Sequence, residues 1–249
     1  IVNNSQTIYT LKDFDTKEFI LYHHLGLGDH IICNGLVNYI SLKKDKIFLP
    51  VNEIFHDQIS YLYSHNKKIT ILPFFVKEVN DVSNLITEYS KDHNLPILKV
   101  GFESRINQKI PFYKSFYKQL GLKYNISYKY FNCPTNEEKE SLLYSELLNQ
   151  FEVKNENYIL VHDEASDESY NLNIQSKLKK ISLSNKYDIF NNIFFYRKLI
   201  MEASEIHCVN SSFAHLLDRF ETNGNRIYHD IRGGRLKFKK KWSYIEYRN

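Results

Sequence analysis

The Gly26-Leu27-Gly28-Asp29 turn is the first stretch of the sequence that could carry out chemistry. It follows an apolar run and precedes a helical pattern, so it joins a predicted buried strand to a predicted helix. A helix that begins at such a turn directs unpaired N–H groups and the positive end of its dipole toward the turn, where an anion or a sugar oxygen binds. Asp29 therefore has two interpretations, a helix cap, which the local sequence favours, or a general base that faces the cleft.

Small and titratable residues surround this aspartate. Gly26 and Gly28 carry no Cβ, so they allow a sharp turn through positive φ or a close approach of the backbone to a ligand. His24 and His30 flank the turn together with His23, and three titratable rings are more than a cap requires. Alternation along a strand sends His23 and His24 to opposite faces, so we expect at most one of these two to face the site.

Hydroxyl-bearing residues open another predicted helix after another short predicted strand. Asn210, Ser211 and Ser212 form this turn, and His215 follows about one helical turn later on the face of the serines. Two hydroxyls and unpaired N–H groups at a helix N-terminus suit a diphosphate. The alternative is a Ser N-cap followed by a partly buried histidine, and the sequence does not decide between the two.

Three further residues are candidates for an anion site. His162 directly follows a predicted buried strand at 157–161, which repeats the strand-then-polar-loop arrangement of the first turn. Lys177 lies in a lysine-rich stretch after that loop, where it either meets a phosphate or belongs to a solvated face. Arg105 follows a predicted strand in the first half of the chain, where it either holds an anion or lies at the surface.

The sequence argues against several classes of function. Ile31 stands where a dinucleotide-binding turn has its third glycine, and no GxxxxGK[ST] phosphate loop occurs. The three cysteines are far apart, which disfavours a disulfide framework and a zinc cluster and favours a reducing compartment. The net charge of +4, from 33 basic and 29 acidic residues, is too small to indicate nucleic-acid binding.

Apolar patterns in the first half predict strands that alternate with helices, which implies a parallel sheet. The predicted strands are 18–22, 46–50, 68–72 and 96–100. The predicted helices are 31–40, 51–65, 83–91 and 111–120. The last of these helices carries an aromatic stripe that we interpret as core or interface rather than as a platform for a sugar.

A predicted linker over 122–136 leads to a second part of the chain. Its predicted elements are a helix at 137–151, strands at 157–161 and 205–209, and a helix that ends at 199–204. We therefore expect an α/β protein with two Rossmann-like domains, 1–130 and 131–249. For the basic and aromatic tail 232–249 we expect either packing back on the first domain or peripheral contact with an anionic membrane.

The two turns together resemble motifs of the lipopolysaccharide heptosyltransferase family. Gly26-Leu27-Gly28-Asp29 is similar to the Gly-Asp turn of that family, whose aspartate is thought to be the catalytic base. The stretch 210–216 is similar to its Asp-Thr-Gly-x-x-His-Leu turn, which binds the donor diphosphate, although Asn210 replaces the acid. The resemblance implies the GT-B fold, in which two Rossmann-like domains with parallel sheets face a central cleft.

The resemblance also implies an inverting, metal-independent glycosyltransferase of polysaccharide biosynthesis that needs no cofactor. Asp29 would be the catalytic base, acting on a hydroxyl of a glycan or lipid-linked acceptor. The nucleotide-sugar donor would bind Asn210, Ser211, Ser212, His215, His162 and Lys177. The acceptor side of the cleft would include His24, Gly26, Gly28, His30 and Arg105.

The implied setting is cytoplasmic, at most peripheral to the inner face of a membrane, with no nucleic-acid partner. Two alternatives stay open from the sequence. One is a protein O-glycosyltransferase, since fucosyltransferase-like enzymes share the two-domain layout. The other is a non-catalytic module that binds a sugar nucleotide or a glycan.

Overall fold

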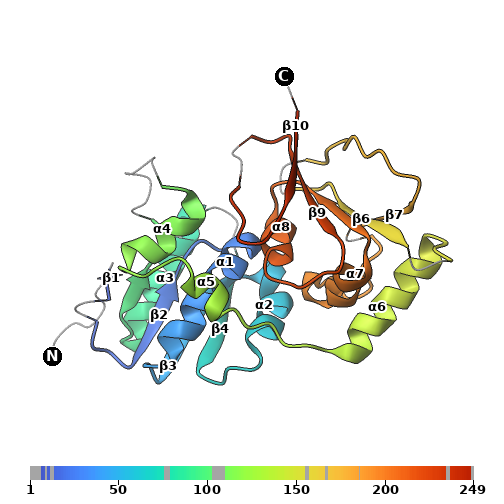
Figure 1. Cartoon of the computed structure of the whole chain (residues 1–249). Helices are drawn as coiled ribbons and strands as arrows, with labels where there is room; N and C mark the ends of the chain where they lie inside the picture. The colour runs from blue at the N-terminus through green and yellow to red at the C-terminus, as the bar shows by residue number, and fades with distance from the viewer. Residues whose placement is uncertain are drawn as a thin grey trace. The chain divides into compact units, whose positions relative to one another are not determined.

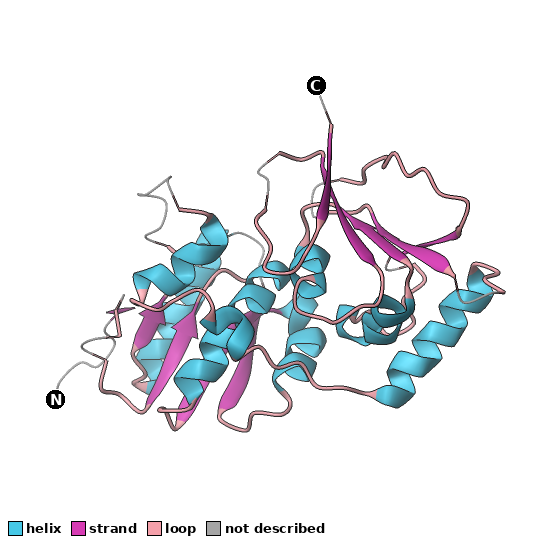
Figure 2. Ribbon diagram, in the orientation of Figure 1, coloured by secondary structure: helices cyan, strands magenta, loops and turns pink. Residues whose placement is uncertain are grey.

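The chain forms two compact units in the computed structural model, residues 1–134 and residues 135–249. The structure describes residues 7–8, 10–11, 14–75, 79–102, 110–154, 157–165, 168–184, 186–233 and 236–247. Each unit contains a five-stranded parallel sheet with helices packed on it (Figures 1 and 2). The α/β class expected from the alternating patterns is therefore confirmed in both halves.

The sheet of the first unit has the strand order β1-β5-β2-β3-β4. Its strands are β1 (Thr7–Ile8), β2 (Glu18–Tyr22), β3 (Lys46–Asn52), β4 (Ile69–Phe74) and β5 (Ile97–Lys99). The chain passes from β2 to β3 on one side of β2, whereas β5 pairs with β2 on the other side. The strand order reverses between β2 and β5, and open α/β sheets bind ligands at the carboxyl ends of strands at such a point.

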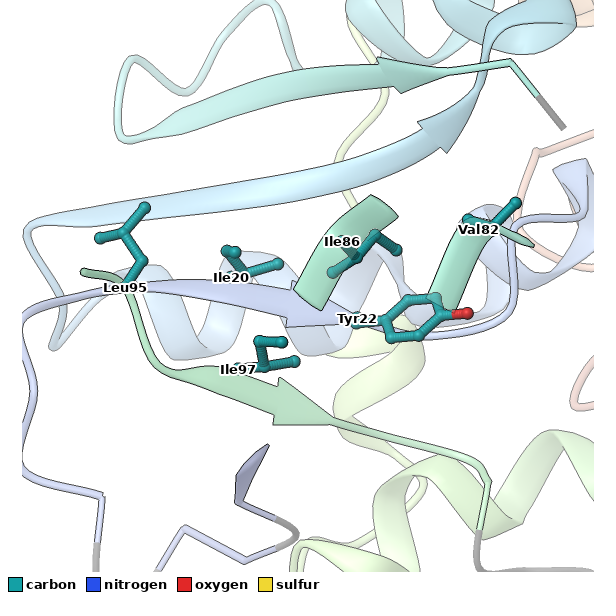
Figure 3. Packing of buried hydrophobic residues seen from close by; sticks show 6 residues of the cluster. All are labelled: Ile20, Tyr22, Val82, Ile86, Leu95 and Ile97. Atoms are coloured by element: carbon teal, nitrogen blue, oxygen red, sulfur yellow. The ribbon is translucent and has the colours of Figure 1, made fainter. Parts of the chain in front are cut away.

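Helices connect these strands and cover the sheet. They are α1 (Leu27–Ser41), the 3-10 helix η1 (Glu53–Phe55), α2 (His56–Tyr63), α3 (Val79–His93), α4 (Phe112–Gln119) and α5 (Ile126–Lys129). Val82 and Ile86 of α3 lie four residues apart and pack against Ile20 and Tyr22 of β2 (Figure 3). Helix α1 is buried over eleven of its fifteen residues, so it forms the centre of this unit.

The segment predicted as a linker belongs to the first unit up to Pro134. It contains α5, whose backbone approaches Gly35 of α1 so closely that a Cβ there would lie 2.6 Å from the Ile126 carbonyl oxygen. Asn34 of α1 accepts a hydrogen bond of 2.8 Å from the Asn132 backbone N–H. The linker interpretation of 122–136 is therefore wrong for most of its length, because close packing on α1 holds the segment.

The sheet of the second unit has the order β10-β9-β8-β6-β7. Its strands are β6 (Tyr158–His162), β7 (Lys179–Ser182), β8 (Glu205–Cys208), β9 (Asn225–Asp230) and β10 (Ser243–Glu246). Its helices are α6 (Glu137–Gln150), the 3-10 helix η3 (Ile193–Tyr196), α7 (Arg197–Glu202) and α8 (Ser212–Leu217). Strand β6 pairs with β7 on one side and β8 on the other, so this sheet also reverses its strand order, between β6 and β8.

The tail contributes to the second unit. Its strand β10 pairs in parallel with β9. The buried carboxylate of Asp218 accepts hydrogen bonds from the backbone N–H groups of Lys239 and Lys240, each at 3.0 Å, and from the Trp242 indole at 3.1 Å. These contacts hold the aromatic part of the tail on the second unit. Across the described part of the chain, no helix has both the length and the apolar content to span a bilayer.

Candidate active site

A pocket of about 300 Å³ lies at the carboxyl edge of the first sheet, where its strand order reverses. Its walls come from the ends of β2 and β3, the turn before α1, the 3-10 helix η1, α3 and the residues after β5. The lining residues are Tyr22, His24, Leu25, Gly26, Asp29, Asn52, Phe55, Val82 and Phe102. Asp29 is the only carboxylate among these described lining residues, and most of the others are apolar or aromatic.

Asp29 lies in the first turn of α1, three residues after the N-cap position held by Gly26. The Asp29 carboxylate hydrogen-bonds to the backbone of Gly26, which favours its charged form and completes one half of a capping box. Burial has the larger effect and raises the pKa of Asp29 to about 7. Capping and exposure to the pocket thus occur together, and the role of Asp29 as a base stays a prediction.

Gly26 is needed for close approach and not for an unusual backbone. Its φ of −68° is accessible to any residue. A Cβ at this position would lie 2.8 Å from the Asp29 Oδ2 atom, so a side chain would displace the carboxylate. Of the two uses of this glycine that the sequence left open, positive φ and close approach, the structure shows close approach. Gly28 lies within α1 itself.

An aromatic wall borders the pocket beside Asp29. The His24 ring stacks on Phe102 with 4.5 Å between centroids, and its Nε2 lies 3.3 Å from the Gly101 carbonyl oxygen. Gly101 has φ of +89°, and a Cβ there would lie 2.4 Å from the Phe116 ring, so only glycine fits. Phe112, half exposed, meets His24 edge-on at 5.3 Å. Flat apolar surfaces of this kind suit the apolar face of a sugar ring.

His23 and His30 lie inside the first unit, not at the pocket. Their side chains are 1% and 0% exposed, and the two rings pack edge to face with 4.5 Å between centroids. Burial lowers the pKa of His23 to about 4 and lowers the pKa of His30 well below its usual value. The assignment of His30 to the cleft is thus wrong, because the helix turns its ring into the core. Of the neighbours His23 and His24, only His24 reaches the pocket, as strand alternation predicted.

The second unit has its polar turn at the corresponding place in its own sheet. His162 ends β6 and Ser211 follows β8, the two strands between which the order reverses. Ser211 Oγ lies 3.4 Å from His162 Nδ1, and the His162 ring stacks on Phe213 at 4.8 Å. Ser211 occupies the N-cap position of α8 without a capping hydrogen bond from its side chain. Burial lowers the pKa of His162 to about 4, so the ring is neutral at pH 7.

A polar pocket of about 400 Å³ adjoins this turn. It is lined by Glu168, Tyr170, Asn210, Ile231, Arg232 and Gly233. The Arg232 guanidinium donates a hydrogen bond to the Asn210 carbonyl oxygen and lies 6.0 Å from the centre of the Tyr170 ring. The pocket thus combines one arginine, one carboxylate and an amide at the carboxyl ends of β8 and β9.

The structure places the remaining predicted donor residues in different surroundings. Ser212 begins α8, and His215 lies within α8, where burial and the nearby Arg219 lower the pKa of His215 to about 3. Lys177 is exposed and lines a separate pocket with Glu152 at the amino ends of β6 and β7. Its assignment to the donor site is therefore wrong, because that edge is opposite to the one that carries Asn210. Arg105 lies outside the described residues.

Sequence patterns did not single out several lining residues. Asn52, Phe102 and Arg232 each lie at or just beyond the carboxyl end of a strand, and that position was the available signal. Tyr170 lies in an irregular segment that offered no such signal. In the described ranges, no group of three or more His, Cys, Asp or Glu residues is arranged to hold a metal ion.

Comparison with solved structures finds a similarity in fold. No protein-family model matches the chain, and no curated protein matches it. The chain is similar in structure to the glycosyl transferase family 9 crystal structure from Veillonella parvula, with a TM-score of 0.56. The match covers 94% of this chain and 88% of that chain at 10% sequence identity. The two proteins therefore share a fold.

Proposed function

We propose that this protein is a glycosyltransferase in which Asp29 removes the proton from an acceptor hydroxyl group. The observation that carries this proposal is a carboxyl group with a pKa of about 7, at the point where a parallel sheet reverses its strand order. A general base works best when its pKa lies near the working pH, because it is then both ionised and basic. The shared fold with a glycosyl transferase family 9 structure supports this class of reaction.

In the proposed reaction, the Asp29 carboxylate accepts the proton of the acceptor hydroxyl. The acceptor oxygen forms a bond to the anomeric carbon of the donor sugar. The bond between that carbon and the donor diphosphate breaks, and its electron pair leaves with the diphosphate. One displacement from the opposite face inverts the configuration at the anomeric carbon. The aromatic wall of His24 and Phe102 would hold the acceptor ring so that its hydroxyl faces Asp29.

We propose that the second unit binds the donor diphosphate. Arg232 and the polar atoms of Asn210 and Ser211 would neutralise the charge that develops on the leaving group. An arginine in this role would replace the metal ion that other transferases use, which is why we propose metal-independent transfer. The acceptor would be a glycan or a lipid-linked sugar, because the aromatic wall beside Asp29 offers a flat surface for a sugar ring.

A panel of nucleotide-sugars tests the proposal. The protein is incubated with each donor, with and without EDTA, and two quantities are measured, the melting temperature and the release of nucleoside diphosphate. A ligand at about 100 times its dissociation constant adds roughly 2.7 kcal/mol of stability. We expect one donor class to stabilise the protein and to be slowly hydrolysed, in both cases independently of EDTA. Stabilisation without any release would support a non-catalytic binding module instead.

A further inference from the structure

Two buried histidines lie side by side on the second sheet, at a distance from the turn just described. His207 of β8 is 3% exposed and His229 of β9 is 0% exposed. The register of β8, β9 and β10 places His207, His229 and Ile245 on one face of the sheet. The opposite face carries Tyr158 and Leu160, and Tyr158 donates a hydrogen bond to α7. The histidine pair therefore lies on the face away from that helix.

A continuous chain of hydrogen bonds passes through the pair. Glu205 Oε2 lies 3.2 Å from His207 Nε2, and His207 Nδ1 lies 2.9 Å from His229 Nε2. His229 Nδ1 lies 2.7 Å from the Tyr247 hydroxyl, which in turn lies 2.9 Å from the Asn173 backbone nitrogen. We call these five groups the relay.

Donor and acceptor chemistry fixes the direction of the relay. The Glu205 carboxylate accepts, so His207 carries its proton on Nε2 and accepts at Nδ1. His229 must then donate from Nε2 and accept at Nδ1 from the Tyr247 hydroxyl. At the other end, the Asn173 backbone N–H donates to the Tyr247 oxygen. A hydroxyl oxygen can accept this bond whichever way its own proton points, so the Glu205 end alone sets the direction, with both rings neutral and protonated on Nε2.

The relay ends on an irregular segment, residues 168–178, which we call the strap. The strap connects β6 with β7, and its first residues include Glu168 and Tyr170, two walls of the polar pocket around Arg232. The Tyr170 backbone N–H donates a hydrogen bond to the Asp163 carbonyl oxygen, at 2.8 Å. Further along the strap, the Asn173 N–H donates a hydrogen bond to the Tyr247 hydroxyl oxygen, and the Lys180 ammonium lies 3.4 Å from the Ile174 carbonyl oxygen.

We propose that Tyr247 is a positioning residue, which through the relay holds the strap and with it the Tyr170 wall of the polar pocket, and that this hold requires at least one of His207 and His229 to be neutral. The part that concerns the pocket rests on the proposed donor-binding function, whereas the hold on the strap does not. No substrate needs to touch Tyr247 for this role.

The surroundings of the pair keep both rings neutral. Burial lowers the pKa of His229 to about 4, and the neighbouring His207 adds to this effect. Burial also lowers the pKa of His207. Glu205 acts in the opposite direction and raises this pKa, whereas Lys180 of β7 lowers it further. One added proton, on His229 Nδ1, turns only the last bond around, so that His229 donates to the Tyr247 oxygen, which keeps a lone pair for the Asn173 N–H. A second added proton places two N–H groups face to face between the rings and separates them.

Hydrogen exchange in the intact protein tests the hold on the strap. Tyr247→Phe removes the hydroxyl, and Tyr244→Phe is the matched control, because its hydroxyl donates to the Leu236 carbonyl oxygen at 3.1 Å and not to the strap. We expect the amides of residues 170–175 to exchange about fivefold to tenfold faster in Tyr247→Phe and at the wild-type rate in Tyr244→Phe. Equal exchange in wild type and Tyr247→Phe would overturn the inference.

Two further readouts separate positioning from general stability. Nitrogen NMR should find both rings protonated on Nε2 in the wild type and in Tyr247→Phe, with a shifted His229 Nδ1 signal in the variant, because that nitrogen loses its hydrogen-bond donor. The exchange ratio of Tyr247→Phe to wild type should fall toward one only as the pH drops below about 4, where the second proton separates the rings and releases the wild-type strap as well. A ratio that is independent of pH, or rings protonated on Nδ1, contradicts the relay.

Binding of inorganic pyrophosphate tests the effect on the pocket. Calorimetry should show a dissociation constant about fivefold larger for Tyr247→Phe than for wild type, and an unchanged constant for Tyr244→Phe. A looser strap with unchanged pyrophosphate affinity overturns the part of the inference that concerns the pocket. If the wild type binds no pyrophosphate, the donor-site assignment in the proposed function fails, and with it the link from strap to pocket, while the exchange data still decide the hold on the strap.

Discussion

Asp29 of the first unit and Arg232 of the second both lie just beyond the carboxyl ends of a parallel sheet, but their surroundings differ. The pocket around Asp29 is mostly apolar, and the cost of burying a charge there raises the pKa of the carboxyl group to about 7. The pocket around Arg232 is lined by Glu168, Asn210 and Tyr170, which supply polar partners for a charged ligand. One topology therefore places a buried carboxyl group in one unit and an arginine beside a carboxylate in the other.

The two turns also differ in the residue at the N-cap position of the helix that follows. Gly26 has no side chain, so the Asp29 carboxylate has room to reach the N-terminus of α1. That terminus is therefore occupied by a side chain of the protein itself. Ser211, at the equivalent position before α8, contacts His162 and leaves the backbone without a side-chain cap. In the first turn a side chain thus caps the helix, whereas in the second turn the N-cap side chain does not cap α8.

Of the variants, Asp29→Asn should have the largest effect on turnover. It tests the proton-accepting role that we propose for the first unit. Loss of a general base lowers turnover by about 10²–10⁴-fold, while donor binding changes little. The measurement is the rate of nucleoside diphosphate release at saturating donor. In the wild type, this rate should rise with pH through about 7, as Asp29 loses its proton. Full activity of the variant would exclude Asp29 as the base.

The same substitution should stabilise the fold at alkaline pH. The pKa of Asp29 is raised in the folded state from 3.8 to about 7, so the folded protein binds more protons than the unfolded chain between these values. Stability therefore falls as the pH rises through this window and is lowest above it. A neutral amide has no such cost, so Asp29→Asn should gain on the order of 2–4 kcal/mol at pH 8 and little at pH 4 in urea unfolding. An unchanged pH slope would contradict the burial of the charge.

Gly26→Ala should lower turnover by about tenfold to a hundredfold with little loss of stability. Its backbone accepts alanine, but the new Cβ would stand 2.8 Å from Asp29 Oδ2 and displace the carboxylate. Gly121→Ala is the matched control, since Gly121 has φ of +70° and no heavy atom within 4 Å of a new Cβ. That control should cost about 1 kcal/mol of stability and leave turnover unchanged. Equal turnover in both variants would mean that the position of Asp29 does not matter.

Arg232→Gln should weaken pyrophosphate binding by about tenfold, because a charge-assisted contact to an anion is lost. Arg226→Gln is the control, from the strand β9 that precedes Arg232. Arg226 donates to the carbonyl oxygens of Leu217 and Phe220, so its loss should lower the melting temperature and not the affinity. Calorimetry and thermal unfolding on both variants separate these effects. A loss of affinity that is the same in both variants would point to a structural role for Arg232.

The sequence predicted the first unit better than the second, and burial explains why. The apolar run of β2 is buried on both faces, and its predicted bounds of 18–22 coincide with the strand. In the second unit, β7 begins with two exposed lysines, and β10 is exposed at both of its ends. These strands lack an apolar run, since they lie at the edges of the sheet and pairing holds them. No local pattern distinguishes such strands from loops.

The candidate sites were predictable to the extent that they follow strand ends. Asp29, His162 and Ser211 were found because each follows a recognisable buried strand. Lys177 was misplaced because β7 was not recognised, so the edge of the sheet on which it lies was unknown. Burial raises the pKa of Asp29, and residues from other elements, such as Phe55 and Phe102, line its pocket, so a local sequence window does not reveal this environment.

Ser211→Ala should have the smallest effect and decides what the second turn does. An ordinary N-cap serine costs about 1 kcal/mol when it is replaced by alanine. Ser211 makes no capping hydrogen bond, so we expect less than about 0.5 kcal/mol in urea unfolding and about threefold weaker pyrophosphate binding. Asn136→Ala is the control, because Asn136 does cap α6 through the Lys139 N–H at 3.0 Å and should cost the full amount without a change in affinity. If Ser211→Ala instead behaves like Asn136→Ala, the second turn is an ordinary helix start, and the contrast between the two units reduces to Arg232 alone.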